Sequence, residues 1–497
     1  MNRITKGLIT ACLFSLVPFA GNVMAQDKLI ELTLEEVISL AKTQSPQSLI
    51  SKHSFRASYW RYRTHKANFL PSLSLNATIP DLNRSISKVT LPDGSDKFVE
   101  RKLMDSYASL SLNQNIGWSG GSIFINSDMQ RIDLFGESTE TSYMSTPVSI
   151  GFSQPLLAYN SYKWERKIEP LVYQEAMKNY IEAIEQISIT AISYFFDLSL
   201  AQLNLSIANI NYSNADTLYK ISRGRFNIGT IAQNELLQME LSFLNSQSAL
   251  REAHLDLEVK KFRLRSFLGF NESVDIQLKI PYYIPDIEID VKSAIAQALE
   301  NNPDMIAYNR QIIESERDVE KAKSESRLNV DLNATYGLTQ SGTTFSNLYN
   351  NPQDQQKASI GISMPIIDWG LGRGKVKMAK SSQEVISTQV TQNKIDFEQD
   401  IYLKVMQFNL QDDQVFIAAK ADTIAQFRYD ISKERFLIGK IDVLELNTAL
   451  TDKDINKRNY ISALRNYWNF YYTIRKITLY DFVKNRPLEQ DFEKLLD

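Results

Sequence analysis

Apolar and polar residues alternate strictly over four short stretches of the chain, a pattern that predicts strands. The stretches are residues 72–79, 147–155, 329–337 and 357–364. A period of two places one apolar and one polar face on each strand. Each stretch has roughly 8–10 residues, close to the roughly 9–11 that a tilted strand needs to cross a bilayer. A half-buried strand of a soluble sheet has the same pattern, so periodicity alone leaves both interpretations open.

Two very long helical segments follow the second and fourth stretches. Residues 156–229 and 366–439 keep a helical period over 74 residues each. At 1.5 Å per residue, such a helix extends roughly 100 Å, whereas the average helix of a globular protein has about 11–12 residues. The matching apolar positions, spaced as in a helix–helix seam, are Ile187, Ala191, Phe195 and Leu198 against Phe397, Ile401, Val405 and Phe408. After each segment the chain turns at a glycine and returns, which predicts long helical hairpins.

The chain contains one large unit twice. Residues 219–235 read YKISRGRFNIGTIAQNE and residues 429–445 read YDISKERFLIGKIDVLE, with nine identical positions at a shift of 210. The same shift relates SIGFSQPLL at 149–157 to SIGISMPII at 359–367. Self-similarity at a fixed shift indicates a duplicated structural unit.

The expected organisation follows from these landmarks. A short amphipathic helix at 32–45 corresponds to one at 289–302, and each is followed by a proline and a second helical stretch. The insertion in the first repeat either adds strands to the sheet or stands outside it as a loop. The predicted segments are a signal peptide (1–25), repeat 1 (26–269), a linker or equatorial region (270–288), repeat 2 (289–480) and a tail (481–497). Repeat 1 has strands at about 72–79 and 147–155, an inserted loop or hairpin at about 80–146, and a helical hairpin at about 156–269 with its tip at Gly229. Repeat 2 has strands at about 329–337 and 357–364 and a helical hairpin at about 366–480 with its tip at Gly439.

The first 25 residues have the pattern of a secretory signal peptide. Arg3 and Lys6 form a basic region, residues 7–20 are mostly apolar, and residues 23–25 form a small-residue cleavage signal. Lipidation at Cys12 is an alternative, but only about five apolar residues precede this cysteine, fewer than the roughly 7–15 of a signal core. Cleavage would remove the only cysteine and leave a net charge of about −5, which argues against a nucleic-acid partner.

Candidate chemistry is sparse. The three histidines, His53, His65 and His254, have no partner at metal-ligand spacing. No glycine-rich phosphate loop and no nucleophile motif is present. We therefore expect a protein that is not an enzyme and has no cofactor and no metal. A secreted hydrolase would need a catalytic cluster that the sequence lacks.

The repeat pattern resembles the TolC-type outer membrane efflux protein family. The resemblance is carried by two repeats of helix–strand–strand–long helix–turn–helix, by the tips RFNIGT and RFLIGK, and by LR…YYTIRKITLYDF at 464–482. It implies a mostly α fold with a β part, in which three chains form one outer-membrane β-barrel continued by a periplasmic α-helical barrel. Physics favours closure independently, because four to six strands leave two open edges, which lipid does not tolerate.

The resemblance also implies a function. The homotrimer would be the outer membrane tunnel of a tripartite efflux or type I secretion system in a Gram-negative-type bacterium. It would receive substrates from an inner-membrane transporter through a periplasmic adaptor (membrane fusion) protein, and its barrel would contact outer membrane lipid. The sequence leaves the substrate and the transporter class open. A secreted coiled-coil scaffold without a pore is the alternative, and it explains the helices but not the four strands.

Three sets of site residues follow from the resemblance. Adaptor docking falls on the tips, although the glycines also suit a left-handed turn and the arginines suit helix C-termini. A periplasmic gate falls on acidic residues just after the tips, which also suit a helix N-terminus. The docking residues are Arg225, Phe226, Ile228, Gly229, Thr230, Arg435, Phe436, Ile438, Gly439 and Lys440; the gate candidates are Glu235, Asp442 and Glu445; and the membrane-interface aromatics are Tyr159 and Trp369, which could instead pack at the strand–helix junctions.

The gate departs from the pattern of the best-known family member. Phe436 stands where that member has a tyrosine, and Ile441 stands where it has an arginine. The bonds that would lock the gate therefore differ in this chain.

Overall fold

The structure is a computed structural model that describes residues 28–136, 138–270 and 274–496. The predicted signal peptide and Cys12 lie outside these residues. The chain forms two compact units, one of Met1–Val37 and Asp197–Pro281 (unit 1) and one of Ile38–Phe196 and Tyr282–Asp497 (unit 2). Helices α1 (Leu34–Gln44) and α3 (Ser161–Asn227) contribute to both units.

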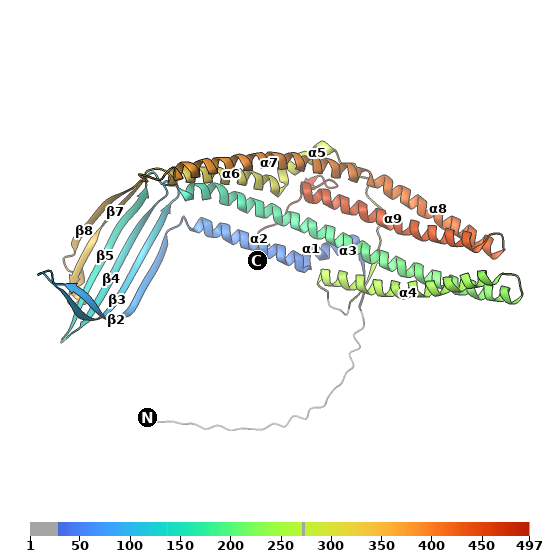
Figure 1. Cartoon of the computed structure of the whole chain (residues 1–497), viewed down its shortest axis with the longest axis horizontal. Helices are drawn as coiled ribbons and strands as arrows, with labels where there is room; N and C mark the ends of the chain where they lie inside the picture. The colour runs from blue at the N-terminus through green and yellow to red at the C-terminus, as the bar shows by residue number, and fades with distance from the viewer. Residues whose placement is uncertain (1–27, 137, 271–273, 497) are drawn as a thin grey trace, which may run out of the picture. The chain divides into compact units, whose positions relative to one another are not determined.

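Unit 2 contains an antiparallel sheet of six strands in the order β2-β3-β4-β5-β7-β8 (Figure 1). The inserted segment of the first repeat supplies β3 and β4, so it adds two strands to the sheet. The strands are longer than the alternating stretches. Charged residues around 81–105 interrupt the alternation, so the pattern marks only part of the strands there. Their bounds are β2 (Ser72–Thr90), β3 (Asp96–Ile116), β4 (Gly121–Phe135), β5 (Thr139–Pro155), β7 (Asn329–Gly342) and β8 (Gln353–Ser363).

The sheet has one apolar and one polar face, and η1 (Phe345–Tyr349) covers part of it beside β5 and β7, where Leu348 is fully buried. Within the described residues, the outer strands β2 and β8 have no partner on their outer side. Every residue of β8, and all but one of β2, is exposed. Across the apolar face the register aligns Leu73, Leu112, Ile125, Ile150 and Tyr336, and across the polar face it aligns Ser74, Ser111, Asn126, Ser149 and Gly337. A sheet whose two edge strands are unpaired and exposed needs further molecules to cover its edges.

Along the sequence, helices come before and after the strands of the sheet. Ser45 and Asn302 cap α2 (Pro46–Ala67) and α6 (Pro303–Glu325), and in both helices a proline takes the first turn, where its missing N–H costs nothing. The other helical elements are α4 (Gln233–Leu268) in unit 1, and α5 (Val291–Asn301), η1 (Phe345–Tyr349), α7 (Leu371–Asn409), α8 (Gln411–Leu437) and α9 (Val443–Thr478) in unit 2.

The two long helical segments differ from each other. α3 runs without a break for 67 residues. Pro170 lies in its third turn, inside the segment whose pattern predicts a helix. In the second repeat the helix is interrupted at Leu410, where α7 ends and α8 begins. The expectation of two equivalent uninterrupted helices is therefore wrong for the second repeat.

A buried ion network stabilises unit 2. Glu185 on α3 accepts from Lys42 at 2.7 Å and from Arg475 on α9 at 3.1 Å. Arg475 also pairs with Asp481 at 2.6 Å. Burial is the largest single influence and lowers the pKa of Arg475, but the charge and hydrogen bonding of Glu185, together with Tyr471 and Tyr472, outweigh it and the pKa is raised. Removing one member would leave an uncompensated buried charge, which is strongly destabilising.

The residues after α9 return to α2. Beyond a two-residue pairing of β9 (Tyr480–Asp481) with β10 (Arg486–Pro487), Phe492 packs against Phe55 with ring centroids 5.0 Å apart. The Arg56 Nε donates to the Leu495 carbonyl at 2.6 Å. The tail thus completes the packing of α2.

Unit 1 contains a two-stranded parallel sheet that the sequence analysis missed. β1 (Lys28–Thr33) pairs with β6 (Val274–Lys279), which lies in the predicted linker. The helix expected at 32–45 therefore begins at Leu34, and Thr33 and Glu36 form a reciprocal capping box at its start. Ile276 of β6 is buried, as are Leu264 and Leu268 of α4.

Candidate functional site

Both hairpin tips use the same backbone turn. Gly229 and Gly439 have left-handed φ angles of 73° and 74°. In each tip the glycine N–H donates three residues back and the next N–H donates five residues back, at 2.9 Å in all four bonds. This is a Schellman ending, in which glycine adopts at no steric cost a conformation that other residues avoid. The left-handed turn accounts in structural terms for the glycine of the shared RFxIG pattern.

The side chains of the two tips differ in exposure. Phe226 is 37% exposed on the first tip, whereas Phe436 is 7% exposed on the second. Ile228 and Ile438 are both exposed, at 75% and 66%. Arg225 is half-buried and its counterpart Arg435 is exposed. The first tip therefore exposes its aromatic ring, whereas the second tip buries the corresponding ring within its own hairpin.

The predicted gate residues lie in the first turn of each returning helix. Glu235 and Glu445 are both the third residue of their helix and both are exposed. Asp442 is the N-cap of α9, and its carboxylate accepts from the Glu445 N–H at 2.8 Å. Ala232 occupies the same place before α4 and makes no side-chain cap. Asp442 thus has a capping role, while a gating role for all three acids stays a prediction.

Different contacts hold the two hairpins together. In the first, Tyr219 stacks on Phe243 with centroids 5.8 Å apart. In the second, the corresponding pair is Tyr429 and Lys453, whose Nζ lies 4.5 Å from the ring centroid. Burial raises the pKa of Tyr429, so the ring stays a neutral phenol beneath the lysine cation. Further ion pairs between α8 and α9 are Arg428–Asp452 at 2.5 Å and Lys457–Asp422 at 2.9 Å.

The two predicted interface aromatics are unequally covered. Tyr159 is half-buried beside the end of α6, where the Ser324 Oγ donates to the Leu157 carbonyl at 3.1 Å. Trp369 is 96% exposed and has a φ angle of 53°. It follows Asp368, which accepts from the Gly370 and Gly372 N–H groups.

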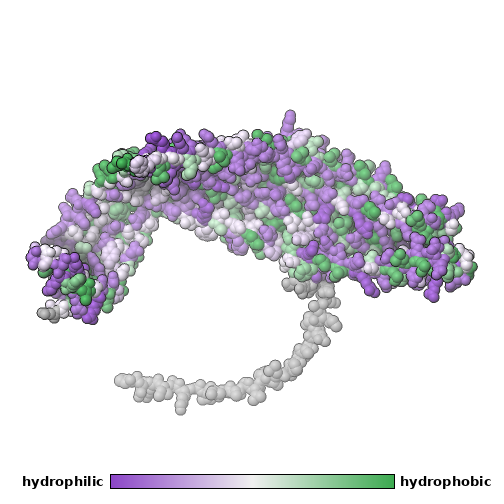
Figure 2. Space-filling view, viewed as in Figure 1, coloured by the Kyte–Doolittle hydropathy of each residue, from purple (hydrophilic) through white to green (hydrophobic). Residues whose placement is uncertain are grey.

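Trp369 belongs to a larger apolar patch that the sequence analysis did not single out. The patch lies where β8 leads into α7, and Figure 2 shows it as a cluster of hydrophobic side chains. Its other members, Met364, Ile366, Ile367 and Leu371, are at least 58% exposed. The signal was present in the sequence as an apolar run directly after a strand. Patches of this kind mark surfaces that bind protein or membrane.

Within the part of the chain that the structure describes, no group of three or more His, Cys, Asp or Glu side chains could hold a metal ion. Among the same residues, no helix combines the length and the apolar character that a membrane span requires.

The architecture is that of bacterial outer membrane channels. The Campylobacter jejuni CmeC outer membrane channel is 15% identical and superposes with a TM-score of 0.65, covering 93% of this chain and 88% of its own. The outer membrane protein VceC from Vibrio cholerae is 13% identical, with a TM-score of 0.63 over 90% of this chain and 95% of its own. The Neisseria gonorrhoeae MtrE outer membrane channel in its open state is 13% identical, with a TM-score of 0.60 over 90% and 88%.

Sequence similarity covers the second part of the chain. Residues 294–478 match the family model described as outer membrane efflux protein. The comparison with curated protein sequences gave no match. The family resemblance and the mostly α fold class with a β part, both expected from the sequence, are confirmed. The same findings support the expected outer membrane location and channel function.

Proposed function

We propose that this chain is the channel subunit of an outer membrane efflux or secretion system, and that three copies close into one tunnel. The sheet would form a β-barrel in the outer membrane, and the helices would continue it into the periplasm. The observation that carries the proposal is the pair of bare sheet edges, because an unpaired edge cannot stand in lipid. The repeat in the sequence predicts how those edges meet.

One seam between the repeats is already closed within the chain. β5 pairs with β7, and the ladder continues as the Leu156 N–H donates to the Val330 carbonyl at 2.8 Å. Below it, Arg310 on α6 pairs with Glu175 on α3 at 2.8 Å. This seam joins the end of the first repeat's strands to the start of the second repeat's strands.

The two bare edge strands correspond, through the sequence repeat, to the two strands that pair at this seam. The shift of 210 converts β5 into β8, and the shift of 257 that relates Pro46 to Pro303 converts β7 into β2. Pairing of Ser153 with Asn333 within the chain therefore predicts pairing of Ser363 with Asn76 of the neighbouring copy. The exposed apolar patch around Trp369 would then lie against the end of α2 of that copy, as Tyr159 lies beside α6. Covering this patch gives the assembly an apolar contribution that a single chain lacks.

The partners follow from the same proposal. The helical tips would dock a periplasmic adaptor, which links the tunnel to an inner-membrane transporter. Phe226, Ile228 and Ile438 are the exposed apolar side chains available for that contact. The acids after the tips would give the periplasmic mouth a preference for cations. The cargo is set by the transporter rather than by this chain.

Cysteine cross-linking tests the predicted register. With Cys12 replaced by serine, Asn76→Cys combined with Ser363→Cys introduces the only two thiols in the chain. Directly opposed residues on antiparallel strands have Cβ atoms about 4.5–5.5 Å apart, within reach of a short thiol cross-linker. We expect covalent dimers and trimers in the outer membrane fraction, and no larger species because the ring is closed.

The matched control is Asn76→Cys with Ile362→Cys. Ile362 is the residue before Ser363 in β8, and its side chain points to the opposite face. Equal cross-linking of both pairs would contradict the register. A soluble product without cross-links would refute the channel and favour the secreted scaffold.

A further inference from the structure

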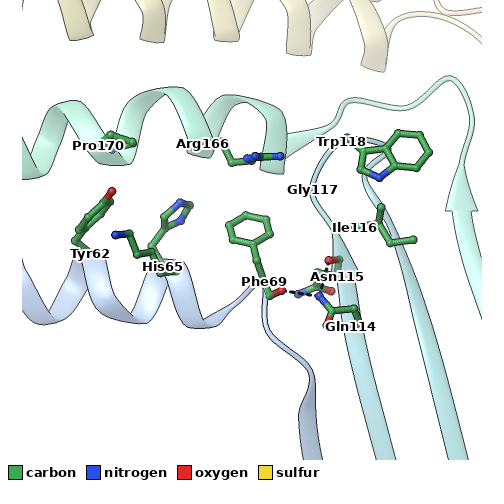
Figure 3. Close-up of a pocket in the computed structure, with 11 residues that line it drawn as sticks. Tyr62, His65, Phe69, Gln114, Asn115, Ile116, Gly117, Trp118, Arg166 and Pro170 are labelled. Carbon is green, nitrogen blue, oxygen red and sulfur yellow. Dashed lines mark hydrogen bonds between the residues drawn. The ribbon is translucent and has the colours of Figure 1, made fainter.

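A pocket of about 670 Å³ opens where the sheet of unit 2 meets the ends of α2 and α3. Figure 3 shows Tyr62 and His65 of α2 and the following Phe69 on the same side of the pocket, with Arg166 of α3 across from them. The β3–β4 turn closes one end and carries Trp118, which is 81% exposed. No function assigned above uses this pocket.

The walls of the pocket are fixed by direct contacts. Gln114 on β3 donates from its Nε2 to the Phe69 carbonyl at 2.5 Å, and Asn115 donates to the Asn68 carbonyl at 2.9 Å. At Gly117 a side chain would meet the Phe69 ring at 3.0 Å and Arg166 at 3.3 Å, so the turn passes as close to the helices as backbone allows. The cavity is therefore preformed rather than a gap between mobile loops.

The pocket is cationic. Lys66 and Arg166 line it, and none of the residues that line it is a carboxylate. Within the described residues neither cation forms an ion pair. Lys66 lies 4.5 Å from the Tyr62 ring centroid, and Glu169, about one turn from Arg166, is held by Arg61 at 2.8 Å. Two unneutralised cations beside aromatic rings favour an anionic group such as a phosphate.

An apolar groove continues from the pocket. Ile116 lines both the pocket and a second hollow of about 720 Å³ on the sheet. The hollow runs over Ala334 and Ala358, which pair across β7 and β8, and is bordered by Phe152 and Tyr336. The two alanines leave a channel between larger neighbours on the mostly apolar face, where Gln356 and Lys357 also line the hollow. A groove of this composition matches a hydrocarbon chain.

We propose that the pocket and the groove together bind one phospholipid with an anionic headgroup, in the periplasmic leaflet of the outer membrane. Lys66 and Arg166 hold the headgroup phosphate, and an acyl chain lies over Ala334 and Ala358. Trp118 sits at the level of the headgroups, where tryptophan is favoured. A soluble anion would not need the groove, and an apolar peptide would not need the cations. The inference rests on the proposed function, because it requires the sheet to stand in the membrane.

Lipid retention on the purified full-length trimer tests the proposal. Native mass spectrometry in neutral detergent would compare phosphatidylglycerol with phosphatidylcholine of the same acyl chains. We expect preferential retention of phosphatidylglycerol by the wild type. The double variant K66E/R166E should weaken this retention roughly tenfold or more, since each cation near a lipid surface contributes favourably. Ala334→Phe, which fills the groove, should also weaken it.

The control is K163E/K323E, which makes the same charge change on exposed lysines outside the pocket. It should retain phosphatidylglycerol as the wild type does. Equal retention of both lipids, equal loss in the control, or equal stabilisation by inorganic phosphate would overturn the proposal. If the trimer assembles in the outer membrane without this lipid preference, only the lipid site fails; if it does not assemble, the channel itself fails.

Discussion

The two hairpin tips share a backbone turn and the side chains of the RFxIG pattern, but they differ in exposure and in the contacts that join their hairpins. Both turn at a left-handed glycine with the same pair of hydrogen bonds. The first hairpin is joined by aromatic stacking and leaves Phe226 open to solvent. The second is joined by ion pairs, buries Phe436 and caps its returning helix with Asp442.

This difference separates turn formation from recognition. Because the glycine alone fixes the turn, the surrounding side chains are free to diverge between the repeats. The first tip has the larger free apolar surface, so we expect it to contribute more to adaptor binding. The second tip buries Phe436 and has the side-chain cap at Asp442, so we expect it to be the more resistant to local opening. Three sets of variants test this comparison.

Removing the two phenylalanines should have the largest and most unequal effect on stability. Phe436→Ala deletes a buried ring and should lower the free energy of unfolding of its hairpin by about 3 kcal/mol, whereas Phe226→Ala should cost no more than about 1 kcal/mol. Hydrogen exchange of α8–α9 and of α4 measures the two effects.

The binding effect should run the other way. Phe226→Ala should weaken capture of a purified periplasmic adaptor, because an exposed aromatic residue is a typical binding anchor. Equal losses of stability in the two hairpins would show that the difference in burial has no energetic consequence.

Replacing the tip glycines should have an intermediate and equal effect. Gly229→Ala and Gly439→Ala each force a side chain into the left-handed region and should cost about 1–2 kcal/mol. Gly224→Ala is the control, because Gly224 is helical with open space around it and alanine should stabilise it by about 0.5–1 kcal/mol. Thermal unfolding or hydrogen exchange gives the sign of each change. A stabilised Gly229→Ala variant would mean that the turn does not need glycine.

The helix caps should have the smallest effect on stability, and the cap of α9 should be possible to reproduce at α4. Asp442→Ala removes the bond to the Glu445 N–H and should destabilise α9 by about 1 kcal/mol. Ala232→Asp should add the equivalent bond to the Glu235 N–H and stabilise α4 by a similar amount. Local hydrogen exchange at the first turn of each helix measures both. If neither substitution changes protection, capping does not distinguish the tips.

The parts that could be predicted from the sequence are those with a periodic or conformational signature. Alternation located the cores of four strands, and the repeated glycines located both turns. The capping role of Asp442 was also readable, since Asp442 and Glu445 have the spacing of a capping box, but the family resemblance directed attention to a gate.

Other parts depend on contacts that no local pattern records. β1 and β6 are six residues each and pair across almost the whole first repeat; β6 alternates apolar and polar residues, but nothing local indicates its distant parallel partner. The outer halves of β2 and β3 carry charges on both faces and lose the alternation that strands usually show. The cationic pocket brings together Lys66 and Arg166, which lie 100 positions apart. Only the folded sheet and helices make them neighbours.

The return of the tail to α2 sets an order of events. Arg56 and its hydrogen-bond partner Leu495 are 439 residues apart, and the Phe55 ring packs against the ring of Phe492, which also belongs to the tail. Synthesis proceeds from the N-terminus, so α2 is made long before these partners. The surface of α2 that packs against the tail therefore stays uncovered until Phe492 and Leu495 have been made.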